Sequence, residues 1–92
     1  MIPKAWIVFD GTGPTIFASA NVASIIRNSP GNYSVYFTNS IGASAGMAGN
    51  SQGLVRPISV SSFSANFDTA ILSGGLFQPH DYNYVSCLFF SL

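Results

Sequence analysis

Turn-forming residues interrupt this 92-residue chain every few positions, and their spacing limits the fold more than any other feature. Gly, Ser, Asn and Pro separate short apolar segments that are rich in Val, Ile, Phe and Tyr. β-Branched and aromatic residues favour strands, whereas helices need longer periodic stretches. We therefore expect an all-β protein with one domain over residues 1–92. The expected architecture is a compact antiparallel β-sandwich or small barrel of seven to eight short strands.

The N-terminal segment illustrates this pattern. Residues 4–9 are apolar on both faces of a strand, which predicts burial on both sides. The Asp-Gly-Thr-Gly-Pro sequence at 10–14 is strong turn chemistry and ends this strand. A short second strand is expected at 15–19.

A β-hairpin is predicted next. Its first strand, residues 22–27, is expected to place Val22 and Ile25 on opposite faces, because side chains alternate along a strand. Residues 28–32 form a loop of a length that closes a hairpin. The second strand, residues 33–38, alternates apolar and polar residues, which predicts one buried face and one solvent face.

The second half of the chain is less regular. Residues 40–53 are rich in Ala, Gly and Ser, which fits a flexible loop or a strand of small side chains equally well. Residues 54–62 predict a strand in which Pro57 marks an edge or a bulge. Residues 62–68 predict another strand, with Phe63, Ala65 and Phe67 on one side. A loop over 70–83 and a last strand over 84–92 complete the expected fold.

The balance of charge and hydrophobicity indicates self-association. Only 7% of the residues are charged while 48% are hydrophobic, against about 25% charged in typical soluble domains. A small domain has much surface to cover, and Cys87 alone cannot form an internal disulfide, so oligomerisation is the expected source of stability. The net charge of zero argues against a nucleic-acid or membrane partner, since both select clustered Lys and Arg.

No residue pattern predicts catalysis, a metal site or a cofactor. His80 and Asp81 lie in a serine-rich chain, but no Gly-x-Ser-x-Gly nucleophile turn occurs. The spacing of His80, Asp81, Asp68 and Cys87 does not resemble a zinc motif. We therefore expect His80 and Asp81 to form a turn or a subunit contact, and the protein not to be an enzyme.

Several residues are candidates for contacts with a partner. Trp6 is expected in the core or in an interface, and Tyr36 and Tyr82 are expected to be accessible to a partner such as a glycan. Arg27 and Arg56 are interpreted either as members of ion pairs with Asp68 or Asp81, or as solvated edge residues. The candidate contact residues are Trp6, Arg27, Tyr36, Arg56, His80, Asp81 and Tyr82. Trp6, Tyr33, Tyr36, Tyr82 and Tyr84 were candidates for a common sugar-binding face.

The order of these segments resembles a small all-β module of bacteriophage tail-fibre proteins. A Lys-Ala-Trp strand runs into Asp-Gly-Thr-Gly at residues 4–13, Asn-Val-Ala-Ser-Ile follows at 21–25, and Asn-Tyr-Ser-Val-Tyr-Phe-Thr at 32–38. Ser-Val-Ser-Ser-Phe at 59–63 and Tyr-Val-Ser-Cys-Leu-Phe-Phe at 84–90 complete the set. Together these segments span most of the chain in the order of the family.

The resemblance implies a phage virion component, assembled in the host cytoplasm as a homotrimer with an all-β fold. Residues 43–53 depart from the pattern, because the family carries bulkier strand residues there. Since Met1 opens the module and Leu92 closes it, we expect attachment to other virion proteins through its own surface. The expected role is a capsid decoration (cement) protein. The alternative is a tail-fibre tip that recognises a host-surface glycan or protein.

Overall fold

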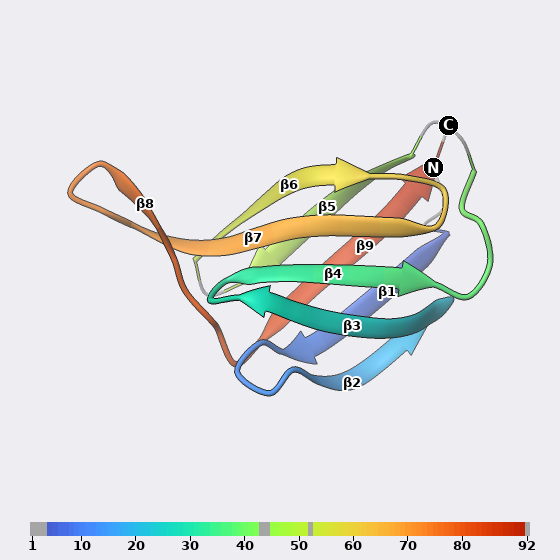
Figure 1. The fold of residues 1–92 in the computed structure, drawn as a ribbon, viewed down its shortest axis with the longest axis horizontal. Helices are drawn as coiled ribbons and strands as arrows, with labels where there is room; N and C mark the ends of the chain where they lie inside the picture. The colour runs from blue at the N-terminus through green and yellow to red at the C-terminus, as the bar shows by residue number, and fades with distance from the viewer. Residues whose placement is uncertain (1–3, 43–44, 52, 92) are drawn as a thin grey trace.

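The computed structural model describes residues 4–42, 45–51 and 53–91, and these consist of strands and turns without a helix. Among them, therefore, no helix is long and apolar enough to cross a membrane. Nine strands form two antiparallel sheets (Figure 1). They are β1 Ala5–Asp10, β2 Thr15–Ala20, β3 Val22–Ser29, β4 Asn32–Phe37, β5 Ala45–Ser51, β6 Leu54–Val60, β7 Ser64–Ser73, β8 Leu76–Pro79 and β9 Val85–Ser91. The predicted all-β fold is confirmed, with nine strands in place of seven to eight.

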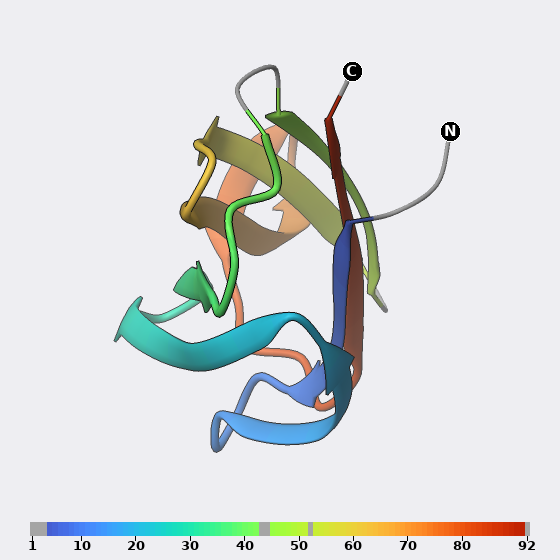
Figure 2. The ribbon, with the colours of Figure 1, turned by 90° about the vertical axis from the view of Figure 1, so that its right-hand side faces the viewer.

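The two sheets pack face to face (Figure 2). Sheet A has the strand order β2-β1-β9-β5, and sheet B has the order β3-β4-β7-β6, with β8 paired to the end of β7. The chain passes from sheet A to sheet B at Asn21, whose φ of 58° lies in the left-handed region that Asn tolerates better than most residues. The Asn21 side-chain amide donates to the carbonyl oxygens of Lys4 and Asn39, which fixes this corner.

The core lies between the sheets and is centred on three aromatic rings. The ring centroid of Phe9 lies 5.1 Å from that of Tyr33 and 6.0 Å from that of Phe67. Along β1, Ala5 and Phe9 are buried, whereas Trp6 is only partly buried. The prediction that residues 4–9 are buried on both faces is therefore wrong. Sheet A has a second sheet on one side only, so the other side chains of β1 lie on its outer surface.

The predicted hairpin is confirmed as β3 and β4, with a shorter turn than expected. Ser29 pairs with Asn32, so only two residues connect the strands, and Gly31 supplies a φ of 72°. The assignment of faces in β3 was wrong, because Val22 and Ile25 both pack against the core. An irregularity in the pairing just after Val22 shifts the alternation of side chains by one residue.

The ambiguous segment 40–53 contains a strand, β5, across half of its length; residues 43–44 and 52 lie outside the described residues. β5 pairs with β9 as the edge strand of sheet A. A methyl group added at Gly49 would lie 2.6 Å from Val55 Cγ1, so a neighbouring side chain occupies that space. At Gly49, β5 has a small residue because the side chain of Val55 leaves no space for a larger one.

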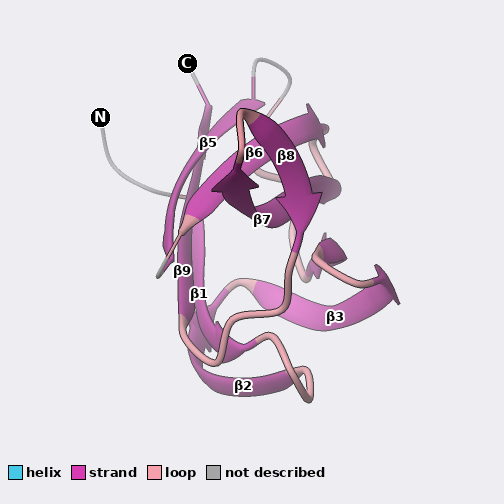
Figure 3. Cartoon of the chain, turned by 90° about the vertical axis from the view of Figure 1, so that its left-hand side faces the viewer, coloured by secondary structure: helices cyan, strands magenta, loops and turns pink. Residues whose placement is uncertain are grey.

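The predicted loop over 70–83 was wrong for most of its length. β7 continues to Ser73, Gly74 and Gly75 make the turn, and β8 returns along β7. Both glycines have positive φ, 59° and 79°, as a two-residue hairpin turn needs. We call this hairpin the β7–β8 arm. It projects beyond the rest of the sandwich in Figure 1 and faces the viewer in Figure 3.

Two further predictions concern sheet B. Pro57 was expected to mark an edge or a bulge, and both features occur: β6 is an edge strand, and its pairing shifts between Pro57 and Ser59. Phe63 was expected to share the inner face with Ala65 and Phe67, which was wrong. Phe63 precedes β7 in a turn and is 61% exposed, whereas Phe67 is fully buried.

Candidate functional site

Asp81 lies in the loop between β8 and β9 and joins three segments at one end of the sandwich. Its Oδ1 accepts hydrogen bonds from Gly31 N and Tyr33 Oη, both at 2.7 Å. Its Oδ2 accepts one from Arg27 Nε at 2.9 Å and lies 2.8 Å from Arg27 Nη2. A carboxylate offers about four lone-pair sites, and these four donors occupy them. Asp81 is therefore a structural anchor whose acceptor capacity is used within the chain.

The electrostatics of this cluster keep the ion pair charged. Burial favours a higher pKa for Asp81, but the hydrogen bonds from Arg27, Gly31 and Tyr33 outweigh it, and the pKa lies below the ordinary value. The hydrogen bond to Asp81 raises the pKa of Arg27. Burial, together with the hydrogen bond to Asp81, raises the pKa of Tyr33. At neutral pH the cluster holds a charged pair and a neutral phenol.

An open hollow of about 280 Å³ lies beside this anchor. It is lined by Thr12, His80, Asp81, Tyr82 and Asn83. The His80 ring packs edge-on against Tyr82 at 4.6 Å between centroids, and the Tyr82 hydroxyl donates to the Ala70 carbonyl at 3.3 Å. Since Asp81 is saturated, the groups that this hollow offers to a ligand are those of His80, Asn83 and Thr12.

The described residues show neither a catalytic triad nor a metal cluster at these positions. Across residues 4–42, 45–51 and 53–91, no hydrogen bond joins the His80 ring to a serine hydroxyl. In the same part of the chain, no three His, Cys, Asp or Glu side chains converge as metal ligands. Cys87 lies in the core, where burial raises its pKa to about 12.

The second ion pair lies on the outer face of sheet B. Arg56 Nη2 lies 2.6 Å from Asp68 Oδ2, and Asn32 Nδ2 donates to Asp68 Oδ1 at 2.6 Å. The Arg56 guanidinium also lies 4.1 Å from the centre of the Phe77 ring, as a cation–π contact. The hydrogen-bonded row continues through Asn66 to Ser34. Of the two interpretations of Arg27 and Arg56, the structure supports ion pairs within the chain.

The outer face of sheet A differs sharply in chemistry. One row of side chains crosses its four strands and comprises Ala20, Trp6, Leu88 and Ala48. The adjacent row comprises Ala18, Val8, Ser86 and Asn50. We call these eight residues the sheet A face. None of them is charged, and Leu88 at its centre is 46% exposed.

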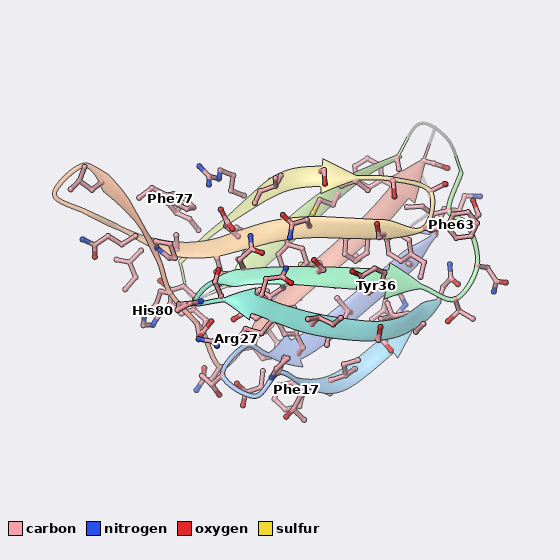
Figure 4. The ribbon with its side chains drawn as sticks, viewed as in Figure 1. Phe17, Arg27, Tyr36, Phe63, Phe77 and His80 are labelled. Carbon is pink, nitrogen blue, oxygen red and sulfur yellow. The ribbon has the colours of Figure 1, made fainter. Side chains whose placement is uncertain are left out.

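The aromatic residues do not form the single sugar-binding face considered from the sequence. Tyr33 is in the core, Trp6 lies on the sheet A face, and Tyr36 is 42% exposed on the outer face of sheet B. Tyr82 contacts His80 at the end of the sandwich. Figure 4 shows Tyr36 and His80 well apart along the long axis. The structure brings together Arg27, His80, Asp81 and Tyr82, whereas Trp6 lies on the sheet A face and Arg56 pairs with Asp68 on sheet B.

Two functional features were missed from the sequence. The β7–β8 arm could have been found from Gly74-Gly75 between apolar residues, which is a hairpin signal. The bond between Tyr33 and Asp81 spans 48 positions and has no local signal. Comparison with known protein families, curated proteins and solved structures yields no match for this chain. Its function is therefore argued from its surfaces.

Proposed function

We propose that this chain is a non-enzymatic structural subunit of a bacteriophage virion, where it decorates the capsid through protein–protein contacts. The observation that carries this proposal is the apolar β7–β8 arm, which projects from the sandwich. Leu76 is 66% exposed and Ile71 38% exposed on this arm. Clustered apolar side chains on a projecting element are typical of a surface that a neighbouring protein covers. The phage assignment is supported by the ordered segments that resemble tail-fibre modules.

Contacts with the rest of the chain hold the arm in place before a partner binds. Phe77 of β8 contacts the Arg56 guanidinium, which also pairs with Asp68. Thr69 Oγ1 donates to the His80 carbonyl at 2.6 Å, where the arm rejoins the sandwich. An arm held in place before binding loses little conformational entropy when a partner covers it. Leu76 is thus presented outward at a low entropic cost.

A tail-fibre tip is the second candidate, because of the hollow beside Asp81. His80 and Tyr82 supply aromatic edges there, and Asn83 and Thr12 supply hydrogen-bonding groups. An apolar ring beside a few convergent polar groups suits a sugar of a host-surface glycan. The homotrimer implied by the resemblance is a separate prediction, which the mass in solution tests.

The copy number per particle distinguishes these roles. Quantitative mass spectrometry of purified virions, against the major coat protein, is expected to give a ratio near one copy per coat subunit. A handful of copies per particle would favour the tail-fibre tip and direct binding assays to the hollow. Absence of the chain from purified particles would overturn both roles.

The arm can be tested separately. Leu76→Asp is expected to reduce binding to particles assembled without this protein by at least about tenfold, because it places a charge in a buried contact. Ile58→Asp is the matched control, since Ile58 is 50% exposed on β6 and lies outside the arm. Equal binding by the two variants would show that the arm is not the docking element.

A further inference from the structure

Most of the charged side chains of this molecule are paired within the chain. The sequence holds six such residues, three cationic and three acidic. Four of them form the two ion pairs, Arg27 with Asp81 and Arg56 with Asp68. The remaining two are Lys4 and Asp10, and both lie beside the sheet A face. Their positions relative to this face therefore bear on what it binds.

Lys4 and Asp10 mark opposite ends of the sheet A face. Residues two apart on a strand share a face, so Asp10 points outward together with Trp6 and Val8, whereas Lys4 is exposed immediately before β1. Lys4 N–H donates to the carbonyl of Phe89, the partner of Ala5, at 2.7 Å, which ties Lys4 to β9. Asp10 Oδ1 accepts a hydrogen bond from Thr12 N at 2.9 Å, which holds its carboxylate at the other end. About 20 Å separates the two charges, at roughly 3.3 Å per residue.

We infer that the sheet A face binds the same face of a second copy of this chain, with the two β1 strands antiparallel. A two-fold axis between the copies, crossing the strands between Trp6 and Val8, generates this arrangement. It places Lys4 of each copy over Asp10 of the other, so that both remaining charges are paired. An axis parallel to the strands would place Lys4 over Lys4 and Asp10 over Asp10, which is repulsive. The charges thus select the antiparallel arrangement.

The same axis also matches the shapes of the two rows. It lays the row that contains Trp6 and Leu88 over the row of the other copy that contains Val8 and Ser86. Large side chains then oppose small ones across the interface, as interdigitating sheet faces do. At either end of β9, Phe90 of one copy approaches Tyr84 of the other, which is 53% exposed in the single chain. A symmetric dimer is therefore complementary in both charge and volume.

The chemistry of the face favours a second copy over other partners. An anionic membrane or a nucleic acid needs clustered cations, and this face has Lys4 alone at one end. Four strands about 4.8 Å apart and about 20 Å long give an area of about 400 Å² per copy. A standard interface buries about 800 Å² per partner, so we expect a weak dimer that dissociates on dilution. This dimer does not depend on the virion role and differs from the homotrimer implied by the resemblance.

A charge exchange tests the arrangement on the full chain. Sedimentation equilibrium is expected to show reversible dimerisation of the natural protein. Lys4→Glu and Asp10→Lys should each weaken it at least about tenfold, because each places like charges together twice. An equimolar mixture of the two variants should restore dimerisation, since every close pair between them is then opposite in sign. The single variants distinguish this arrangement from the parallel one, in which the natural protein already places Lys4 over Lys4 and Asp10 over Asp10, so that neither substitution would weaken dimerisation.

A second pair of variants tests the face without altering Lys4 or Asp10. Leu88→Glu is expected to abolish dimerisation, whereas Ile26→Glu, at a similarly exposed site (48%) on sheet B, should leave it unchanged. Circular dichroism would verify that each variant is folded. Three results would overturn the inference: a monomer at millimolar concentration, a trimer that Leu88→Glu leaves intact, or a mixture that dimerises no better than its components.

Discussion

Asp81 shows how a single carboxylate organises one end of this sandwich. It binds the β3–β4 turn through Gly31, the end of β3 through Arg27, and the core through Tyr33. The Tyr33 hydroxyl also lies 2.9 Å from the Gly11 carbonyl, so the network reaches the turn after β1. Hydrogen bonds to charged groups contribute more than those between neutral groups. The charge of Asp81 is therefore central to the stability of this end.

Asp81→Asn is expected to lower the free energy of unfolding by about 2 kcal/mol near pH 7, because it removes the charge and turns an amide toward the donors. The pKa of Asp81 is lowered by folding, so its contribution is complete above the unfolded pKa of about 3.9 and is lost as pH falls through the folded pKa. Urea denaturation at several pH values should show the two proteins converging below about pH 4.

Asp10→Asn is the control for this measurement. Asn retains an oxygen that accepts the hydrogen bond from Thr12 N, so we expect a loss below about 0.5 kcal/mol near pH 7. A difference between natural protein and Asp81→Asn that stays constant from pH 7 to pH 2 would contradict an ionised Asp81 as the source of the stability.

Cys87 provides a second test at the level of the residue. It is 2% exposed, and burial raises its pKa to about 12, against about 8.5 for a free thiol. The thiolate is the reactive form, so alkylation by iodoacetamide at pH 8 should be at least about a hundredfold slower than for glutathione. Intact mass against time measures this rate. Urea should restore rapid alkylation, and equally fast labelling without urea would show that the core opens at β9.

The residue pairs could be predicted only in part from the sequence. Ion pairs of Arg27 and Arg56 with Asp68 or Asp81 were one of the two interpretations that the sequence left open, and the structure shows both pairs. The burial of Tyr33 was also predictable, because it alternates with polar neighbours in the hairpin. The hydrogen bond from Tyr33 to Asp81 was not predictable, because the packing of the two sheets creates it.

Among the elements, strands with regular alternation were predicted well and glycine-rich segments were not. The β3–β4 hairpin has a turn followed by period-two alternation in β4, which identifies it locally. β5 lacks this signal, because its small residues are selected by neighbours such as Val55 that lie elsewhere in the sequence. The β7–β8 arm was assigned to a loop, since Gly74-Gly75 was interpreted as a loop composition and not as a hairpin turn.

The two hairpin turns allow a matched test of glycine requirements. Gly31 and Gly74 both have positive φ, 72° and 59°. A methyl group at Gly31 would also lie 2.6 Å from His80 N, whereas at Gly74 nothing lies within 4 Å. Gly74→Ala is expected to cost about 1 kcal/mol from backbone strain alone, and Gly31→Ala about 3 kcal/mol, because the backbone near His80 must also move. Urea denaturation compares the two, and similar losses would mean that the β3–β4 turn opens freely.

At the scale of the whole molecule, the two outer faces explain the unusual composition. Sheet B combines a hydrogen-bonded network of Asn, Ser and one ion pair with exposed apolar side chains, among them Ile26 and Tyr36. The two central rows of the sheet A face are uncharged and mostly apolar, with Lys4 just before β1 and Asp10 at its end. A charged fraction of only 7% is compatible with this fold if another protein covers one of its faces. The low charge predicts self-association, and the strand registers are the basis on which we propose the sheet A face as the contact.

The core that these sheets enclose can be tested with two phenylalanines from one segment. Phe67 is fully buried and lies 5.8 Å from Tyr33 between ring centroids, whereas Phe63 is 61% exposed. Phe67→Ala should cost about 4 kcal/mol, through lost burial and the cavity left behind. That is a large part of the roughly 5–14 kcal/mol expected for a domain of this size, so the variant should be partly unfolded at 37 °C.

Phe63→Ala should stay within about 0.5 kcal/mol of the natural protein, because solvent already surrounds most of the ring. Urea denaturation at low protein concentration compares the two variants with the molecule unassociated. A loss of several kcal/mol for Phe63→Ala under these conditions would mean that the turn before β7 packs against the core after all. A loss that appears only at high protein concentration would instead place Phe63 in a contact between copies, since association adds stability by mass action.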